Sequence, residues 1–96
     1  MNVSTQQDFE YLVKRVFDDL VDECTLKEKI LRNGSRVAAK SLIKDALRMK
    51  IEFLEELKKL QVSPDTQTRS KQFRALSNNV ARQSMSIVDR MSDLGL

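Results

Sequence analysis

Residues Ser35–Leu60 have the sequence SRVAAKSLIKDALRMKIEFLEELKKL, and the prediction of the fold starts from them. Apolar residues recur along it at steps of three and four, which is the spacing of one face of an α-helix. At about 100° per residue they spread over roughly 200° of the helix surface, about twice the arc that one neighbouring helix covers. We therefore expect this helix to contact two neighbours, or one neighbour and a partner molecule. Leu47 and Ile51 lie at the edge of the apolar stripe and are candidate apolar contacts with a partner.

Two further amphipathic helices flank the central one, because apolar residues keep the same spacing on either side of it. The predicted helices span about residues 5–32, 36–61 and 64–94. Short connections between them make sequence neighbours antiparallel. We predict a single domain over residues 1–96, with the all-α fold of an antiparallel bundle of three long helices. A bundle of four would follow if helix 1 breaks near Thr25, where Lys27 and Glu28 interrupt the apolar spacing.

The ends of the predicted helices carry capping signals. Asn33-Gly34 predicts the end of the first helix, because glycine readily adopts the left-handed conformation that caps a helix C-terminus. Ser35 is then the predicted N-cap of the central helix. Before the third helix, Ser63 is the predicted N-cap and Pro64 the predicted first helical residue.

The composition excludes several classes of chemistry. The chain has no histidine and one cysteine, Cys24, which excludes His-based nucleophile systems and zinc or iron–sulfur sites built from several Cys or His ligands. Adjacent carboxylates such as Glu55-Glu56 diverge on a helix surface instead of converging on one substrate. We therefore expect no enzyme activity, no catalytic residues, no metal and no cofactor, and we expect Cys24 to be a buried structural thiol.

Targeting signals are absent from the sequence pattern. The first ten residues contain no basic side chain and no apolar run, unlike a secretory signal. No segment approaches the ~20 apolar residues that span a bilayer, and one cysteine cannot form an intrachain disulfide. These features predict no membrane insertion and an intracellular, cytoplasmic location.

Charge is unevenly distributed along the chain. Residues 1–24 carry a net charge of −4, residues 25–61 carry +5 and residues 62–96 carry +2. Two explanations are open. The acidic first helix and the basic central helix attract each other inside the bundle, or the basic part meets an acidic partner or a phosphate backbone.

The basic residues of the central helix form a ladder in which each follows the last by four residues: Arg36, Lys40, Lys44 and Arg48. Such a ladder can face solvent, pair with the acidic first helix, dock on an acidic protein surface, or follow nucleic-acid phosphates. No aromatic residue interleaves with it, so the stacking contacts that bases use are missing. The third helix has a polar row at the same spacing, which includes Arg74 and Arg82 and can donate to carboxylate or phosphate.

These features favour a small non-enzymatic protein–protein interaction module with a regulatory role, such as an adaptor, inhibitor or assembly factor. It would present helix faces to a protein partner. The predicted partner contacts are, by charge, Arg36, Lys40, Lys44, Arg48, Arg74 and Arg82, and by apolar character Leu47 and Ile51. A homodimer that buries these two apolar residues fits the same pattern. The alternatives are a nucleic-acid-binding bundle that uses the basic ladder, and a basic amphipathic helix on anionic lipid.

Overall fold

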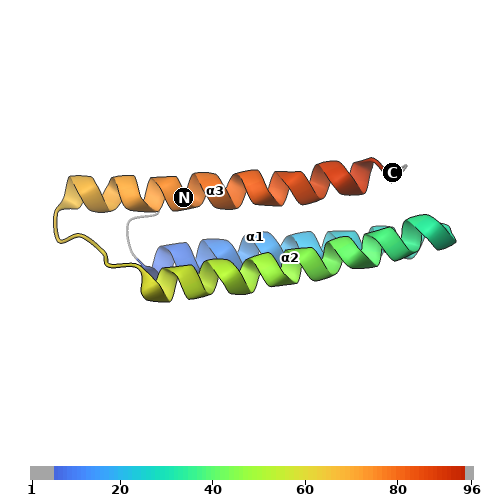
Figure 1. Cartoon of the computed structure of the whole chain (residues 1–96), viewed down its shortest axis with the longest axis horizontal. Helices are drawn as coiled ribbons and strands as arrows, with labels where there is room; N and C mark the ends of the chain where they lie inside the picture. The colour runs from blue at the N-terminus through green and yellow to red at the C-terminus, as the bar shows by residue number, and fades with distance from the viewer. Residues whose placement is uncertain (1–5, 95–96) are drawn as a thin grey trace.

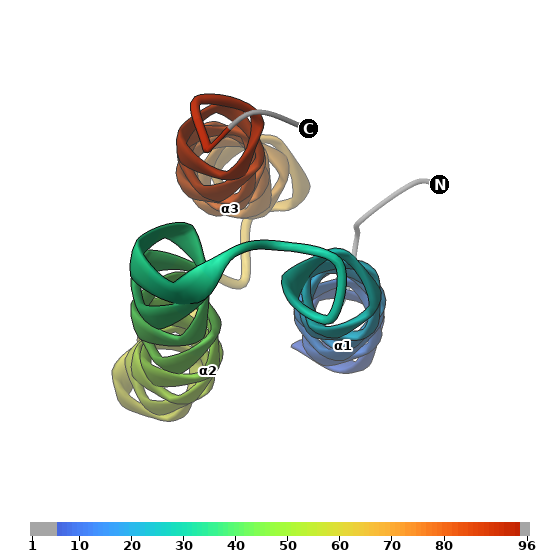
Figure 2. The same cartoon turned by 90° about the vertical axis from the view of Figure 1, so that its right-hand side faces the viewer.

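The computed structural model of the chain describes residues 6–94, and they form three α-helices. Helix α1 spans Gln6–Glu28, α2 spans Asn33–Lys59 and α3 spans Thr66–Ser92. Sequence neighbours run antiparallel in an elongated bundle whose Cα extents are 51 × 18 × 14 Å (Figure 1). Seen along the bundle, the helices lie at the corners of a triangle (Figure 2), and every pair of helices is in contact. The predicted all-α, antiparallel three-helix bundle is confirmed.

Each helix buries one apolar side in a shared core. The buried residues are Phe9, Val13, Phe17, Leu20 and Cys24 from α1, Ala39, Leu42, Ala46, Phe53 and Leu57 from α2, and Phe73, Val80, Ile87 and Met91 from α3. Two aromatic pairs join the helices at different levels. The ring centroids of Phe9 and Phe73 lie 6.3 Å apart, and the rings of Phe17 and Phe53 stack at 5.7 Å. Such pairs add to the stability that apolar burial supplies.

Helix α1 is uninterrupted and ends four residues earlier than predicted. It passes through Thr25, whose hydroxyl donates to the carbonyl oxygen of Val21 at 2.7 Å, so the four-helix alternative is wrong. After Glu28 the backbone N–H groups of Ile30 and Leu31 donate to carbonyl oxygens three residues back, both at 3.2 Å. This spacing is that of a tight 3₁₀ turn, which ends the α-helix. The predicted start at residue 5 lies outside the described residues.

Helix α2 begins at Asn33, so the predicted stop at Asn33-Gly34 and the predicted N-cap at Ser35 are wrong. The N-cap residue is Arg32, which has an extended backbone and no side-chain capping bond. The first bond of the helix runs from the N–H of Arg36 to the carbonyl of Arg32 at 2.7 Å. The corner lies earlier than predicted because the i→i+3 bonds after Lys27 end α1 before Asn33. The carboxylate of Glu28, at the end of α1, pairs across this corner with Arg36 and Lys40 of α2.

Helix α3 begins two residues later than predicted, with Asp65 as its N-cap. The Oδ2 atom of Asp65 accepts from the backbone N–H of Thr68 at 2.9 Å and from its hydroxyl at 2.8 Å. The predicted cap at Ser63 followed by helical Pro64 is therefore wrong. A carboxylate forms stronger, charge-assisted bonds to the exposed N–H groups of a helix start than a hydroxyl does. The Ser63 hydroxyl instead accepts from the backbone N–H of Asp65 at 3.2 Å.

The connection between α2 and α3 is held by one side chain of α3. The amide oxygen of Gln72 accepts from the N–H of Ser63 at 3.0 Å, and its amide nitrogen donates to the carbonyl of Gln61 at 3.2 Å. These two hydrogen bonds of the Gln72 side chain tie the extended connection to the first turns of α3.

Helix α2 ends at Lys59, and α3 ends at Ser92, both two residues before their predicted ends.

Candidate functional site

Ion pairs between helices are concentrated on α1 and α2. The ammonium group of Lys50 donates to Asp18 at 2.6 Å. At the corner, Oε1 of Glu28 accepts from Nε of Arg36 at 3.0 Å and lies 3.8 Å from Nζ of Lys40. The acidic first helix therefore pairs with part of the basic central helix, as one of the two explanations of the charge asymmetry predicts. Lys40 keeps most of its side chain in solvent, so its long pair is weak.

The remaining members of the basic ladder differ from each other. Arg48 lies 3.2 Å from Asp45 and 3.7 Å from Glu52, both within α2. Lys44 forms no ion pair with any residue of the described range 6–94. Arg36 and Arg48 are therefore the closely paired members of the ladder, and Lys44 is its free cation among the described residues.

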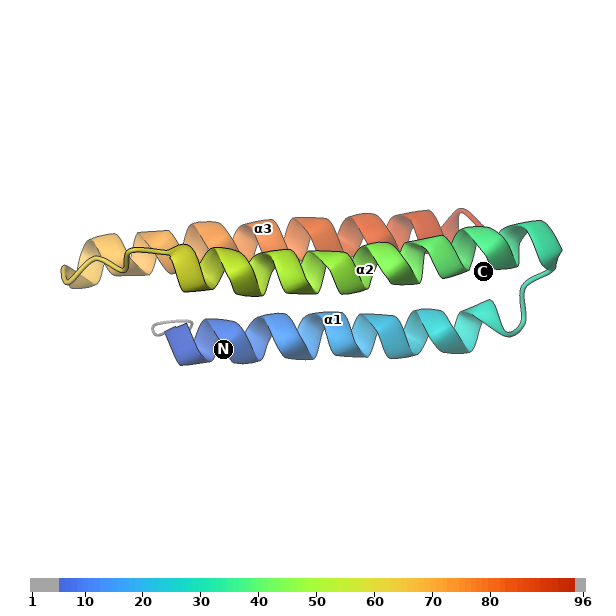
Figure 3. The same cartoon turned by 60° about the horizontal axis from the view of Figure 1, so that its bottom comes forward.

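One side of the α1–α2 pair is left uncovered by α3, and we call it the open face (Figure 3). On α2 it is marked by Leu54, which lines a hollow of about 260 Å³ with Glu10 and Lys14 of α1. Asp45, which bonds to Arg90 of α3 at 2.8 Å, lies nine residues before Leu54 and so on the opposite side of α2. The open face therefore lies on the side of the bundle away from α3.

Steps of three and four residues stay on one side of a helix. Counting back from Leu54 in such steps, the open face of α2 carries Ile51, Leu47, Lys44, Lys40 and Val37. Counting forward from Lys14, the open face of α1 carries Asp18, Val21, Asp22 and Thr25. The two helices thus contribute opposite charges to one surface.

Large aliphatic side chains are exposed on the open face. Leu47 is 42 % exposed, Ile51 is 57 % exposed and Val37 is 69 % exposed. They alternate with Lys40 and Lys44 at the three-and-four spacing that a helix uses to contact another helix. Val37 is not among the predicted partner contacts, although it precedes Lys44 by seven residues and Ile51 by fourteen, a helical spacing that could have identified it.

The structure brings together four of the eight predicted partner contacts, namely Lys40, Lys44, Leu47 and Ile51. Arg36 is occupied at the corner by Glu28. Arg74 and Arg82 are exposed on α3. Arg82 follows the buried Val80 by two residues and therefore points away from the core of the bundle. The predicted basic contacts are consequently divided between two helices and do not form one surface.

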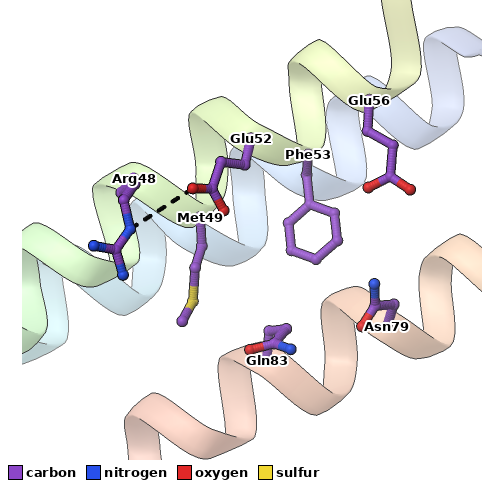
Figure 4. A pocket seen from close by; sticks show the side chains of 7 residues that line it. All are labelled: Arg48, Met49, Glu52, Phe53, Glu56, Asn79 and Gln83. Carbon is purple, nitrogen blue, oxygen red and sulfur yellow. Dashed lines mark ion pairs between the residues drawn. The ribbon is translucent and has the colours of Figure 1, made fainter. Parts of the chain in front are cut away.

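A second hollow, of about 430 Å³, lies between α2 and α3 (Figure 4). Its lining residues are Arg48, Met49, Glu52, Phe53, Glu56, Asn79 and Gln83. Met49 and Phe53 point into it from α2, and the amides of Asn79 and Gln83 face it from α3. Phe53 is almost fully buried, so this hollow offers hydrogen-bonding groups and carboxylates, and little exposed apolar surface for a helix to cover.

The single thiol lies in the core, and its predicted burial is confirmed. Cys24 is 2 % exposed. Burial raises the pKa of this thiol, the negative charge of Glu23 raises it further, and Lys27 acts in the opposite direction. A raised pKa leaves little of the nucleophilic thiolate at neutral pH.

Within residues 6–94 no group of three or more Cys, Asp or Glu side chains is arranged to hold a metal ion. None of the described helices combines the length and apolarity that crossing a membrane requires. Comparison with protein-family models, with curated proteins and with solved structures finds no match to this chain.

Proposed function

We propose that the protein is a small interaction module that binds an amphipathic helix with acidic flanks on its open face. The observation that supports this proposal is the exposure of Leu47 and Ile51 in the middle of α2, beside Lys40 and Lys44. The bundle leaves these aliphatic side chains in water although its core is complete without them. Fully burying an exposed aliphatic side chain contributes roughly 1.5–3 kcal/mol. Leu47 and Ile51 are about half exposed, so covering each contributes part of that amount, and a partner that covers both gains a useful part of its affinity.

The spacing of the exposed residues suits a helical partner. Apolar anchors at steps of three and four are what a helix presents to a matching helix or groove. Lysines beside the anchors attract carboxylates and disfavour a basic or purely apolar partner, so they supply specificity. The free ammonium group of Lys44, between Lys40 and Leu47, is the member of the set best placed to meet an acidic residue.

The ion pairs of the ladder favour a protein partner over nucleic acid. Arg36 and Arg48 already lie within 3.0–3.2 Å of carboxylates, so binding phosphates would mean breaking these pairs. Nucleic-acid affinity depends on how many phosphates the protein neutralises. A surface with one free lysine and several exposed aliphatic residues is poorly suited to that purpose.

A synthetic helical peptide tests this proposal. The probe has leucine at its core positions and glutamate on both flanks, carries a fluorescent label, and is compared with the same peptide carrying lysine on its flanks. Fluorescence anisotropy at low protein concentration is expected to show binding of the glutamate peptide. Its affinity should fall several-fold between about 0.05 M and about 0.5 M salt, because salt screens exposed charge pairs.

Two variants and one matched control locate the binding surface. Ile51→Asp and Lys44→Glu should each weaken binding of the glutamate peptide by about tenfold or more, since an unpaired charge at an apolar contact or a like-charge contact costs affinity. Arg82→Glu, on the outer side of α3, should leave binding unchanged. Equal binding of the two peptides, or full binding by Ile51→Asp, would contradict the proposal.

A further inference from the structure

We infer that the acidic helix that binds the open face is α1 of a second copy of this chain. This inference rests on the proposed function, because it uses the same surface and names its partner. From Asp18 to Asp22 the open face of α1 is an acidic strip, and it lies beside the basic and aliphatic strip of α2 that carries Lys40, Lys44, Leu47 and Ile51. When one copy is rotated, the acidic strip of each copy meets the basic strip of the other, so two open faces are complementary.

The two strips have matching chemistry. On α1, Asp18 and Asp22 are exposed and Val21 between them is half-buried. Asp22 forms no hydrogen bond or ion pair within residues 6–94. On α2, Lys44 is equally unpaired and lies next to exposed Leu47. Each strip thus offers a free charge of opposite sign together with an aliphatic side chain.

A two-fold axis parallel to the helices brings the strips together. Because α1 and α2 are antiparallel and adjacent (Figure 3), this rotation places α1 of each copy against α2 of the other, again antiparallel. The contact forms twice and closes, as in the two-fold dimers that are the commonest soluble assemblies. The four helices then form a bundle, and α3 of each copy remains outside it.

The register of this dimer follows from one bond within the chain. The 2.6 Å contact between Asp18 and Lys50 and the stacked rings of Phe17 and Phe53 beside it place Asp18 and Lys50 at about the same height along the bundle. A two-fold axis parallel to the helices preserves height. Val21 and Leu47 are each three residues, or about 4.5 Å, from that level in the same direction, so Val21 of one copy faces Leu47 of the other.

The free charges fall within reach of each other in this register. Asp22 lies four residues, or about 6 Å, from the level of Asp18, and Lys44 lies six residues, or about 9 Å, from the level of Lys50. The height difference of about 3 Å is shorter than a lysine side chain. Asp22 of one copy therefore pairs with Lys44 of the other, at both symmetric positions.

Charge exchange tests the inference on the full chain. Sedimentation equilibrium between about 10 µM and about 1 mM protein should show a monomer–dimer equilibrium, with the dimer favoured at high concentration. Lys44→Glu and Asp22→Lys should each raise the dimer dissociation constant about tenfold or more, because like charges then face each other twice. The double variant restores opposite charges and should return to within about threefold of the unmodified chain.

Arg82→Glu is the matched control, and its dimerisation should be unchanged. Far-UV circular dichroism should show that every variant keeps its helices. A monomer at all concentrations overturns the inference, and so does a dimer that neither single variant weakens or that the double variant fails to restore. A monomer that still binds the glutamate peptide overturns only this inference. A monomer that does not bind the peptide overturns the proposed function as well.

Discussion

The carboxylate of Glu28 and the guanidinium of Arg36 meet at 3.0 Å across the corner between α1 and α2. Glu28 is 8 % exposed, which makes it the buried charged residue of the described chain. It sits where the next apolar residue of the α1 stripe is expected, and its burial is tolerated because Arg36 and Lys40 supply opposite charge. This contact joins the end of α1 to the first two turns of α2.

Removal of this carboxylate should loosen the corner. Glu28→Ala is expected to lower the free energy of unfolding by about 1–2 kcal/mol, because hydrogen bonds to a charged group are lost while the exposure of Arg36 limits the effect. Urea denaturation followed by circular dichroism measures this. Glu55→Ala, on the exposed side of α2, is the control and should change stability by less than about 0.5 kcal/mol. An equal effect of the two variants would contradict the role of Glu28.

Gly34 should accept a side chain with a gain in stability. A Cβ atom built on Gly34 meets no atom within 4 Å, and the residue lies in the first turn of α2. Gly34→Ala is therefore expected to stabilise the protein by about 0.5–1 kcal/mol, since alanine loses less backbone entropy in a helix. A thermal unfolding scan distinguishes this outcome from the earlier prediction of a left-handed cap. A residue in that conformation would be destabilised by the same substitution.

Ser77 carries a hydroxyl that the core does not satisfy. Its Oγ atom is buried and has no hydrogen-bond partner within the described part of the chain. Ser77→Ala removes the burial penalty of the polar group and leaves nearly the same volume, so it should raise stability by about 0.5–1 kcal/mol. Ser84→Ala is the comparison, because the Ser84 hydroxyl donates to the carbonyl of Ala81 at 2.9 Å. A loss of stability in Ser77→Ala would show that the hydroxyl is bonded in solution.

The N-cap of α3 should make stability depend on pH. The backbone N–H of Thr68, and then its hydroxyl, hold the pKa of Asp65 below its ordinary value. Because the pKa of Asp65 is lower in the folded chain than in the unfolded chain, its negative charge stabilises the fold. This stabilisation is complete above the unfolded pKa of about 3.9 and is lost as pH falls through the folded-state pKa.

Asp65→Asn is expected to keep a capping oxygen and to remove this pH dependence, whereas Asp65→Ala removes the cap itself. The melting temperatures of the unmodified chain and of Asp65→Ala should therefore differ at pH 7 and approach each other near pH 3. A difference that persists undiminished at the lower pH would show that the carboxylate charge is not involved.

Helix α3 should detach more readily when one ion pair is removed. Arg90 and Asp45, 2.8 Å apart, form the ion pair that joins α2 to α3 in residues 6–94. Both groups are partly exposed, so Arg90→Gln is expected to cost only about 0.5–1 kcal/mol. Hydrogen exchange should accelerate in the C-terminal half of α3 more than in α1. Uniform acceleration in all three helices would indicate that α3 does not open separately.

The three helices and their core could be predicted from the sequence because helical periodicity is a local property. Phe9, Phe17 and Phe53 fall on the three-and-four apolar spacing of their helices, and all three are buried in the shared core. Helix ends were less predictable. Asn33-Gly34 carries a strong stop signal, yet α1 ends earlier, in the 3₁₀ turn after Lys27, and Glu28 there pairs with Arg36, which is not its neighbour in sequence.

Helical periodicity, read along the chain, predicts the amphipathic helices, their antiparallel order and the wide apolar stripe of α2. Packing between the helices selects which part of that stripe stays in water. The apolar stripes of a three-helix bundle do not determine the side of the α1–α2 pair on which α3 lies, because either arrangement buries the same core. The placement of α3 beside Asp45 covers one flank of α2. It leaves Lys44, Leu47 and Ile51 exposed on the other.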